Sequence, residues 1–137
     1  MTEKSPIVTV IIPTYNSSGT LRLSLETVLQ QDFTDYEIWV IGDNCSDDSE
    51  AVVMSFRDKR VQWINLSVNS GTPSVPRNEG LRRARGRFIA YLGHDDLWFP
   101  WHLSQLVDCI EHLLVLSSPP ILCASHLSFY HTSRYYL

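Results

Sequence analysis

The chain has 137 residues, of which 44% are hydrophobic and 11% aromatic, enough for one domain with its own core and too few for two ordinary domains. Eleven Lys and Arg residues against fifteen Asp and Glu residues give a net charge of −4 at pH 7. This balance argues against a general nucleic-acid or anionic-membrane binder, because such proteins draw their affinity from excess positive charge.

Two apolar strands and a helix are predicted in the first part of the chain. Ile7–Ile12 is nearly all apolar and is bounded by prolines, which is typical of a buried strand. A turn at residues 16–19 leads into a helix with four apolar residues on one face: Leu21, Leu25, Val28 and Leu29. Tyr36–Ile41 is predicted as a second buried strand and is followed by residues 42–44, which favour a turn.

A second helix, a third strand and a third helix are predicted next. Asp47 and Glu50 have the spacing of a capping box at the start of a helix. Val61–Leu66 has the composition of a strand. A long polar stretch over residues 67–76 then leads into a short helix near Asn78–Arg85.

The last predicted elements are a strand, an amphipathic helix and the start of a fifth strand. Phe88–Leu92 is the strand, and Pro100 suits the first turn of the helix that follows. The helix has an apolar stripe: Leu103, Leu106, Val107, Ile110, Leu113 and Leu114. Two prolines at 119–120 end it, and Ile121–Ala124 is the predicted fifth strand.

Alternation of strands and helices predicts an α/β fold with a mostly parallel sheet flanked by helices on both faces. In such sheets ligands bind beyond the carboxyl ends of the strands. Polar clusters follow three of the predicted strands, at residues 14–16, 43–44 and 94–96. The sequence therefore predicts one ligand site at this edge of the sheet.

The last cluster contains candidate metal ligands. Asp95 and Asp96 offer adjacent carboxylates, and Mg²⁺ or Mn²⁺ favours one or two carboxylates with substrate phosphates completing the coordination. An acidic pair shortly before Pro100 is equally typical of a helix N-terminal cap. His94 is either a further ligand or a polar neighbour.

The other clusters contain candidate nucleotide contacts. Asp43 has the chemistry to accept a hydrogen bond from a base or a ribose, or to serve the turn. The Tyr15 ring either stacks on a nucleobase or forms a partly buried cover over the first helix. Arg77 follows residues 71–76, which are expected to form a flexible segment able to bring it to a phosphate. Three further arginines are expected on a solvated helix face: Arg82, Arg83 and Arg85.

The clusters, in this order, resemble the nucleotide-binding half of family-2 glycosyltransferases, which have the Rossmann-like GT-A fold. The matching stretches are residues 8–16, 41–49, 76–86 and 91–98. The chain has no G-x-S-x-G, P-loop or G-x-G-x-x-G motif, which argues against a serine hydrolase, a P-loop NTPase or a standard dinucleotide dehydrogenase.

The resemblance implies a nucleoside-diphosphate-sugar donor, often a UDP-sugar, and a divalent cation, Mn²⁺ or Mg²⁺. It implies that Tyr15 stacks near the base, with the backbone of Pro13 and Thr14 close by. Asp43 then contacts the base or ribose, and Arg77 lies near the base or diphosphate.

For the metal, the resemblance places Asp95 on the metal-binding position of the family's D-x-D motif, with Asp96 a weaker candidate. The sequence departs from the family at two glycines. Gly93 stands where the motif's first carboxylate usually lies, with His94 as a candidate substitute. Gly42 replaces the first acid of the family's usual acidic pair. Both departures bear on metal affinity and donor identity more than on the fold.

The family chemistry is inverting transfer of the sugar to an acceptor hydroxyl, with a carboxylate base from the later, acceptor-side half. Residues 117–137 contain no Asp or Glu, so no base can be assigned. We therefore expect a donor-binding domain over residues 1–116 and, over 117–137, an incomplete or altered start of the acceptor-side region. The alternative is a non-catalytic nucleotide or nucleotide-sugar binding module.

Two further expectations concern the state of the protein. The three cysteines, Cys45, Cys109 and Cys123, form no C-x-x-C motif and leave one thiol over in any pairing, as in a cytoplasmic protein. The N-terminal apolar run is too short for a signal peptide or a membrane span. A missing acceptor half would leave a sheet edge exposed, which predicts a homo-oligomer.

Overall fold

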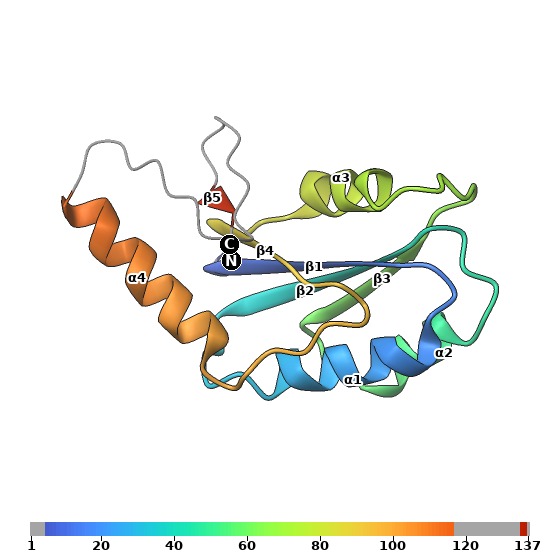
Figure 1. Cartoon of the computed structure of the whole chain (residues 1–137), viewed down its shortest axis with the longest axis horizontal. Helices are drawn as coiled ribbons and strands as arrows, with labels where there is room; N and C mark the ends of the chain where they lie inside the picture. Colours follow the sequence, from blue (N-terminus) through green and yellow to red (C-terminus); the bar gives the residue numbers. More distant parts are fainter. Residues whose placement is uncertain (1–4, 117–134, 137) are drawn as a thin grey trace.

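The computed structural model describes residues 5–116 and 135–136. Figure 1 shows strands and helices that alternate along these residues, as the sequence predicts. In chain order the elements are β1 (Val8–Thr14), α1 (Ser18–Leu29), β2 (Tyr36–Gly42), α2 (Ser49–Ser55), β3 (Val61–Asn65), α3 (Ser74–Arg83), β4 (Phe88–Tyr91), α4 (His102–Leu116) and β5 (Tyr135–Tyr136).

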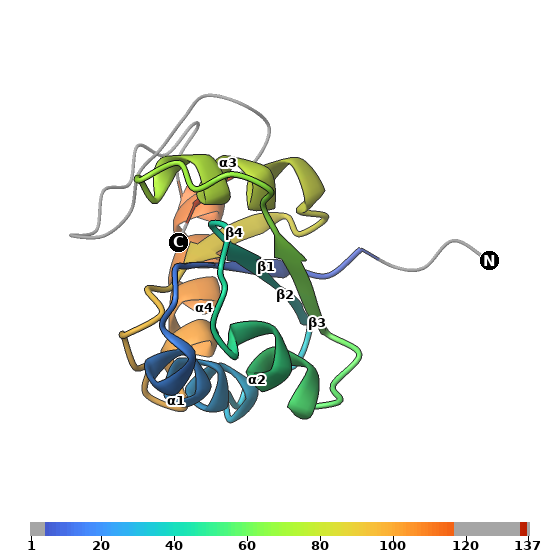
Figure 2. The same cartoon turned by 90° about the vertical axis from the view of Figure 1, so that its right-hand side faces the viewer.

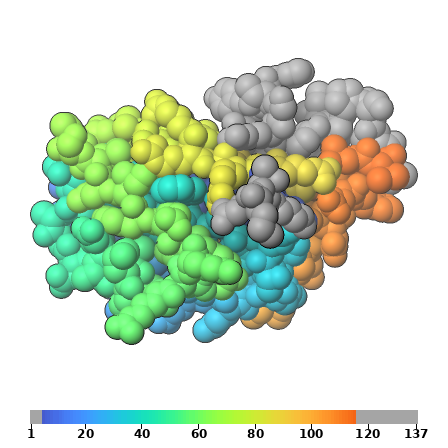
Figure 3. Space-filling model, turned by 180° about the vertical axis from the view of Figure 1, so that it is seen from behind, coloured from blue at the N-terminus to red at the C-terminus, as the bar shows by residue number. Residues whose placement is uncertain are grey.

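The strands form one parallel sheet in the order β3-β2-β1-β4-β5. The predicted strand at Ile121–Ala124 lies outside the described residues. Among the described residues, the strand beside β4 on its outer side is the short segment Tyr135–Tyr136. At the other end of this order, β3 has a neighbouring strand on one side only among the described residues. Its green segment lies at the surface in the view from behind (Figure 3).

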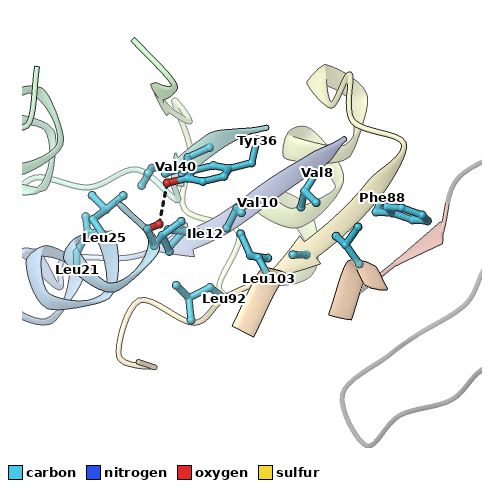
Figure 4. Packing of buried hydrophobic residues seen from close by; sticks show 14 of the residues in the cluster. Val8, Val10, Ile12, Leu21, Leu25, Tyr36, Val40, Phe88, Leu92 and Leu103 are labelled. Carbon is cyan, nitrogen blue, oxygen red and sulfur yellow. Dashed lines mark hydrogen bonds between the residues drawn. The ribbon is translucent and has the colours of Figure 1, made fainter. Parts of the chain in front are cut away.

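Helices cover both faces of the sheet, with α3 on one face and α1, α2 and α4 on the other (Figures 1 and 2). The larger core fills the space on the side of the three helices, where alternate β1 residues, Val8, Val10 and Ile12, are fully buried. Figure 4 shows these side chains beside Tyr36, whose hydroxyl donates to the Val28 carbonyl at 2.8 Å. Burying each large apolar side chain contributes about 1.5–3 kcal/mol.

Both predicted apolar helix faces meet this core. On α1, Leu21, Leu25 and Val28 are buried. On α4 the buried members of the predicted stripe are Leu103, Val107 and Ile110, while Leu106 and Leu114 pack at its margin. Amphipathic spacing alone was sufficient to identify these two helix faces.

Strand β1 continues through Pro13 to Thr14, whereas the sequence predicted that it ends at Ile12. The Ile11 carbonyl accepts from Leu92, beyond the end of β4, and the Thr14 carbonyl accepts from Asp43 on the β2 side. Because backbone groups alternate along a strand, Pro13 faces the β4 side, where β4 has already ended at Tyr91. Proline has no backbone N–H, and it is tolerated there because β4 does not extend far enough to pair with that position.

Two helix starts differ from the prediction. Helix α2 begins at Ser49, and the Asp47 carboxylate accepts from the backbone N–H groups of both Ser49 and Ser18, so that it joins the starts of two helices instead of forming a capping box. Burial acts to raise the pKa of Asp47, but the hydrogen bonds from Ser49 and Ser18 outweigh it and hold that pKa below its usual value. Helix α3 begins at Ser74, four residues before the predicted Asn78.

A buried polar cluster joins β1, β2 and the α3–β4 connection near the amino ends of the strands. The Glu37 carboxylate accepts from Thr9 Oγ1 at 2.8 Å, from the Arg85 backbone N–H at 2.8 Å and from the Arg85 guanidinium at 2.9 Å. Thr9 Oγ1 in turn accepts from the Gly86 N–H at 2.8 Å. Arg85 therefore lies outside the helix and pairs with a buried acid, which corrects the expectation of a solvated helix face.

No helix in the described part of the chain is both long and apolar enough to cross a membrane. The expected boundary between residues 116 and 117 falls where α4 ends, and residues 117–134 lie outside the described structure.

Candidate functional site

A cavity of about 600 Å³ opens at the carboxyl ends of β1, β2 and β4, where the sequence predicted a ligand site. Its lining comes from the ends of these strands, from the loop before α3 and from the first turn of α3. The lining residues are Pro13, Thr14, Tyr15, Asp43, Asn69, Gly71, Thr72, Pro73, Pro76, Arg77, Gly93, His94, Asp95 and Asp96.

Every residue that the sequence proposed for donor or metal binding lines this cavity, although the proposed residues come from four separate segments of the chain. Parallel pairing explains this convergence, because the register that pairs Thr14 with Gly42 sets the ends of β1 and β2 side by side. The structure thus brings the predicted residues together. Their individual roles stay predictions.

Two asparagines in the left-handed region turn the chain directly after β1 and β2. Asn16 has a φ of 44° and Asn44 a φ of 62°, a conformation that asparagine tolerates better than most residues do. The Asn16 side-chain oxygen also accepts from the Ser46 N–H at 2.8 Å, which joins the two turns. This link fixes Tyr15 and Asp43 beside one another at the cavity.

The end of β1 contributes one exposed and one buried side chain. Tyr15 is 50% exposed at the cavity, so its ring is open to a planar ligand. Thr14 is buried, and its Oγ1 has no hydrogen-bond partner in the described residues. A buried hydroxyl without a partner costs free energy unless a ligand or water reaches it.

Asp43 fastens the loop that forms one wall of the cavity. Its carboxylate is only 4% exposed and accepts from the Ser70 N–H at 3.0 Å and from the Ser70 hydroxyl at 2.9 Å. The Asn69 side-chain amide donates to the Asp43 carbonyl at 3.0 Å. Asp43 therefore does not make the local turn contact considered as its alternative role, because its partners lie 26 and 27 residues further along the chain.

The loop residues of this wall, Asn69 to Pro73, were not proposed as site residues from the sequence. Hydrogen bonds within the loop also stabilise its conformation. The Gly71 N–H donates to the Asn69 side chain, and the Ser74 N–H donates to the Thr72 hydroxyl. Gly71 has a φ of 69°, which glycine adopts at little cost. The available signal was the cluster of Asn, Ser, Gly and Thr just before a helix, which is typical of a functional loop.

Arg77 differs from the other arginines of its region. It lies in the first turn of α3, not after a flexible segment, and its guanidinium carbon is 5.4 Å from the centre of the Tyr91 ring. Arg82 and Arg83 both pair with Glu79. Within the described part of the chain, Arg77 has no carboxylate partner, so its positive charge is not neutralised at the cavity.

The acidic turn after β4 presents Asp95 and Asp96 as exposed carboxylates at the cavity. Asp96 accepts from the Gly93 N–H at 3.2 Å, and a His94 ring nitrogen lies 3.3 Å from the Pro13 carbonyl oxygen. Helix α4 begins only at His102, so the acidic pair does not cap it. The alternative reading as a helix cap is therefore wrong.

The chemistry of these side chains fits a divalent cation that takes its other ligands from a substrate. The described residues contain no group of three or more His, Cys, Asp or Glu side chains able to enclose a metal. One or two carboxylates with substrate phosphate oxygens are a usual arrangement for Mg²⁺. The residues thus suit a shared cation and not a closed protein site.

Both glycines that depart from the family pattern lie where neighbouring side chains fill the space. A Cβ on Gly42 would lie 2.7 Å from Asn65 Oδ1 and from a Trp63 ring carbon, and a Cβ on Gly93 would lie 2.5 Å from Asp96 Oδ2. A carboxylate at either position would displace these groups. At Gly93 the Asp96 carboxylate therefore approaches the space that the side chain of residue 93 would take.

Comparison with known proteins gives a consistent result. Residues 9–121 match the model of glycosyl transferase family 2. The UDP-Glc:alpha-D-GlcNAc-diphosphoundecaprenol beta-1,3-glucosyltransferase WfgD of Escherichia coli is 36% identical over 102 residues, which are 74% of this chain and 40% of that protein. The GalNAc(5)-diNAcBac-PP-undecaprenol beta-1,3-glucosyltransferase of Campylobacter jejuni is 36% identical over 75% of this chain and 34% of its own length.

Solved structures show the same fold. Residues 1–349 of Staphylococcus aureus TarS in complex with UDP-GlcNAc superpose with a TM-score of 0.74 at 31% identity, covering 77% of this chain and 31% of that one. The mannosyltransferase PcManGT of Pyrobaculum calidifontis, in complex with GDP-Man and Mn²⁺, gives a TM-score of 0.69 at 23% identity and supports the fold alone. The chain spans 40% or less of the length of these proteins.

Proposed function

The chain belongs to glycosyl transferase family 2, and from this membership we propose that it binds the nucleoside-diphosphate-sugar donor of an inverting sugar transfer to a hydroxyl acceptor. The observation that carries the proposal is that one cavity lining gathers an exposed tyrosine, a buried aspartate, an acidic turn and an arginine that has no carboxylate partner among the described residues. The donor-binding unit is proposed to be residues 1–116.

Different lining residues of the cavity suit different parts of such a donor. Tyr15 stacks on the base, with the backbone of Pro13 and Thr14 beside it. Asp43 accepts from the base or ribose with the part of its carboxylate that Ser70 leaves available, and Arg77 binds the diphosphate through its guanidinium fork. We propose a UDP-sugar because WfgD is described as using UDP-Glc and TarS is in complex with UDP-GlcNAc.

We propose that Asp95 is the principal ligand of a divalent cation, Mn²⁺ or Mg²⁺, with Asp96 and His94 as subordinate candidates. When bound, such a cation stabilises negative charge on a departing diphosphate. Two exposed carboxylates that line the same cavity as Arg77 support this assignment.

The proposed reaction transfers the sugar in one displacement. The acceptor oxygen forms a bond to the anomeric carbon, and the bond from that carbon to the diphosphate oxygen breaks. The nucleoside diphosphate departs with the bonding electron pair, and Arg77 binds its growing charge. The acceptor proton must pass to a base on the opposite face. No residue of this chain is assigned that role.

The experiment that tests donor binding is a thermal-shift panel of nucleoside diphosphates and their sugars, with and without Mn²⁺. UDP and UDP-sugars should raise the melting temperature, more so with Mn²⁺, because a ligand that binds only the folded state stabilises it. Asp95→Ala should lose the metal-dependent part of the shift. Asp108→Ala removes an exposed acid of α4 outside the cavity lining and should keep it.

Two outcomes of the panel count against the proposal in different ways. If no nucleotide stabilises the unmodified chain, the cavity does not bind a donor. If Asp95→Ala keeps the full Mn²⁺ dependence, the nucleotide site stands and the metal assignment is wrong.

A second candidate function is a non-catalytic module that binds a nucleotide or a nucleotide sugar. The cavity lining fits this function equally well, because its proposed residues contact only the donor or the metal and none of them is assigned as an acceptor base. Donor binding without turnover would support this second function.

We also propose that the protein is cytoplasmic and that it self-associates through an exposed sheet edge. Cys45 and Cys109 are free thiols, as in a reducing compartment. In the part of the chain that the structure describes, β3 has one neighbouring strand, and its side chains are exposed or half-buried. Light scattering should give a mass above that of one chain, and a monomeric mass would contradict the proposed association.

A further inference from the structure

Helix α3 lies against a transverse row of side chains in the sheet. Tyr91 and Trp39 are both register partners of Ile11, so the three residues form a row across β4, β1 and β2. At the centre of this row the helix presents Gly80, on which a Cβ would lie 2.6 Å from Ile11 Cγ2. No side chain of Gly80 separates the helix from the strand, which fixes how closely α3 approaches the sheet.

Two arginines flank Gly80 at three residues on either side and therefore lie on the same side of the helix. The guanidinium carbon of Arg77 is 5.4 Å from the centre of the Tyr91 ring, and that of Arg83 is 5.9 Å from the centre of the Trp39 ring. The two contacts are similar in geometry, but only Arg77 lines the cavity.

The two arginines differ in the groups that interact with their guanidinium. Arg83 also pairs with Glu79, whose carboxylate offsets its charge and engages its N–H groups. Arg77, within the described residues, has the aromatic face and no carboxylate. A ring face attracts a guanidinium electrostatically without accepting its in-plane N–H bonds. Arg77 therefore keeps both its charge and its N–H donors for an anion in the cavity.

Tyr91 is itself held in place. It is partly buried and packs against the small core cluster beneath α3, which consists of Ile11, Ala84 and Ile89. An exposed arginine without such a support samples many rotamers, and ordering it on binding costs free energy. A fixed ring reduces that cost because it restricts the guanidinium before the ligand arrives.

We propose that Tyr91 is a positioning residue, which holds the Arg77 guanidinium ready for the diphosphate of the donor. The inference rests on the proposed donor site and adds a residue that neither lines the cavity nor is among the site residues proposed from the sequence. Tyr91 acts through Arg77 and makes no contact with the nucleotide.

The test compares the affinities of UDP and uridine for this chain at fixed Mn²⁺, by titration calorimetry with displacement for the weaker ligand. Tyr91→Leu removes the aromatic face and keeps an apolar side chain. It should weaken UDP binding about two- to five-fold, the range expected for an exposed cation–π contact, and leave uridine binding unchanged. Tyr91→Phe keeps the ring and should restore UDP binding.

The matched control is Trp39→Leu, which removes the equivalent contact to Arg83 on the same helix away from the cavity. It should leave the ratio of UDP to uridine affinity as it is in the unmodified chain. In an Arg77→Gln background, Tyr91→Leu should cause no additional loss of UDP affinity, because the residue that it positions is gone.

The outcomes separate this inference from the proposed function. Unchanged UDP affinity in Tyr91→Leu, or an equal loss for UDP and uridine, overturns the positioning role while the donor site stands. Failure of the unmodified chain to bind either ligand overturns the proposed function itself and this inference with it. If Tyr91→Leu does not fold, Tyr91→Met removes the ring in the same way and is judged by the same ratio.

Discussion

At the scale of single residues, the buried carboxylates of this protein connect segments that are distant in the sequence. Asp43 fastens the loop around Ser70 beside the cavity, and Glu37 joins Thr9 to Arg85 near the opposite edge of the sheet. An ionised carboxylate has about four acceptor positions. Each of these two can therefore hold several backbone and side-chain donors at once, which a neutral side chain of the same size cannot do equally well.

The contribution of Glu37 to stability is a direct prediction. Glu37→Gln replaces a carboxylate oxygen that faces the Arg85 guanidinium with a donor, so the free energy of unfolding should fall by about 1–3 kcal/mol. Glu111→Gln is the matched control, because Glu111 and its partner Arg87 are 47% and 52% exposed. The control should change stability by less than about 1 kcal/mol. Urea unfolding followed by circular dichroism measures both, and equal losses would contradict the role of burial.

At the scale of elements, α3 connects the fold to the cavity. The first turn of α3 contributes Pro76 and Arg77 to the cavity lining. Further along the helix, Gly80 packs closely against Ile11, and Ala84, directly after the helix, belongs to the small core cluster. The sequence placed the start of this helix four residues too late, because Pro76, which lies in the first turn of α3, was taken as part of the preceding loop. Proline is tolerated in the first turn, where its missing N–H has no intrahelical partner.

Substitution of Gly80 tests how closely α3 must approach the sheet. Gly80→Ala should lower the free energy of unfolding by about 1–3 kcal/mol, since the new methyl group would overlap Ile11, even though alanine favours helices by about 1 kcal/mol over glycine. Gly19→Ala is the matched control on α1, where a Cβ meets nothing within 4 Å. The control should be neutral or stabilising in the same denaturation experiment. The same sign for both variants would contradict the close contact.

At the scale of the whole molecule, the described residues form part of a family-2 glycosyltransferase fold, and the chain spans 40% or less of the length of the matched relatives. The acidic side chains at the cavity, Asp43, Asp95 and Asp96, are already proposed to contact the donor or the metal. No residue of this chain is therefore assigned as the acceptor base, and without such a base sugar transfer by the chain should be slow.

We expect the chain by itself to bind a UDP-sugar and to release UDP from it at or near the uncatalysed rate. An assay of UDP release, with and without simple alcohols and sugars as acceptors, measures this. Asp95→Ala serves as the comparison, because any residual turnover at the proposed site should depend on it. Robust turnover that Asp95→Ala abolishes would contradict the expectation and would require a base within this chain.

The sequence by itself determined the order of strands and helices over residues 5–116, the apolar faces of α1 and α4, and the four segments that supply the proposed donor- and metal-binding residues, but not the loop at residues 69–73. These features are local, because periodicity, turn residues and short motifs are encoded within a few neighbouring positions. The family was predicted in the same way and is confirmed by the match over residues 9–121.

Only the tertiary structure decided which side chains meet. The bond from Asp43 to Ser70, the pairing of Arg85 with Glu37 and the support of Arg77 by Tyr91 join residues between 14 and 48 positions apart. The tertiary structure also decided that β1 continues through Pro13, because this depends on where β4 ends. Such contacts depend on strand order, register and the distance between layers, which are properties of the packed whole and not of any short segment.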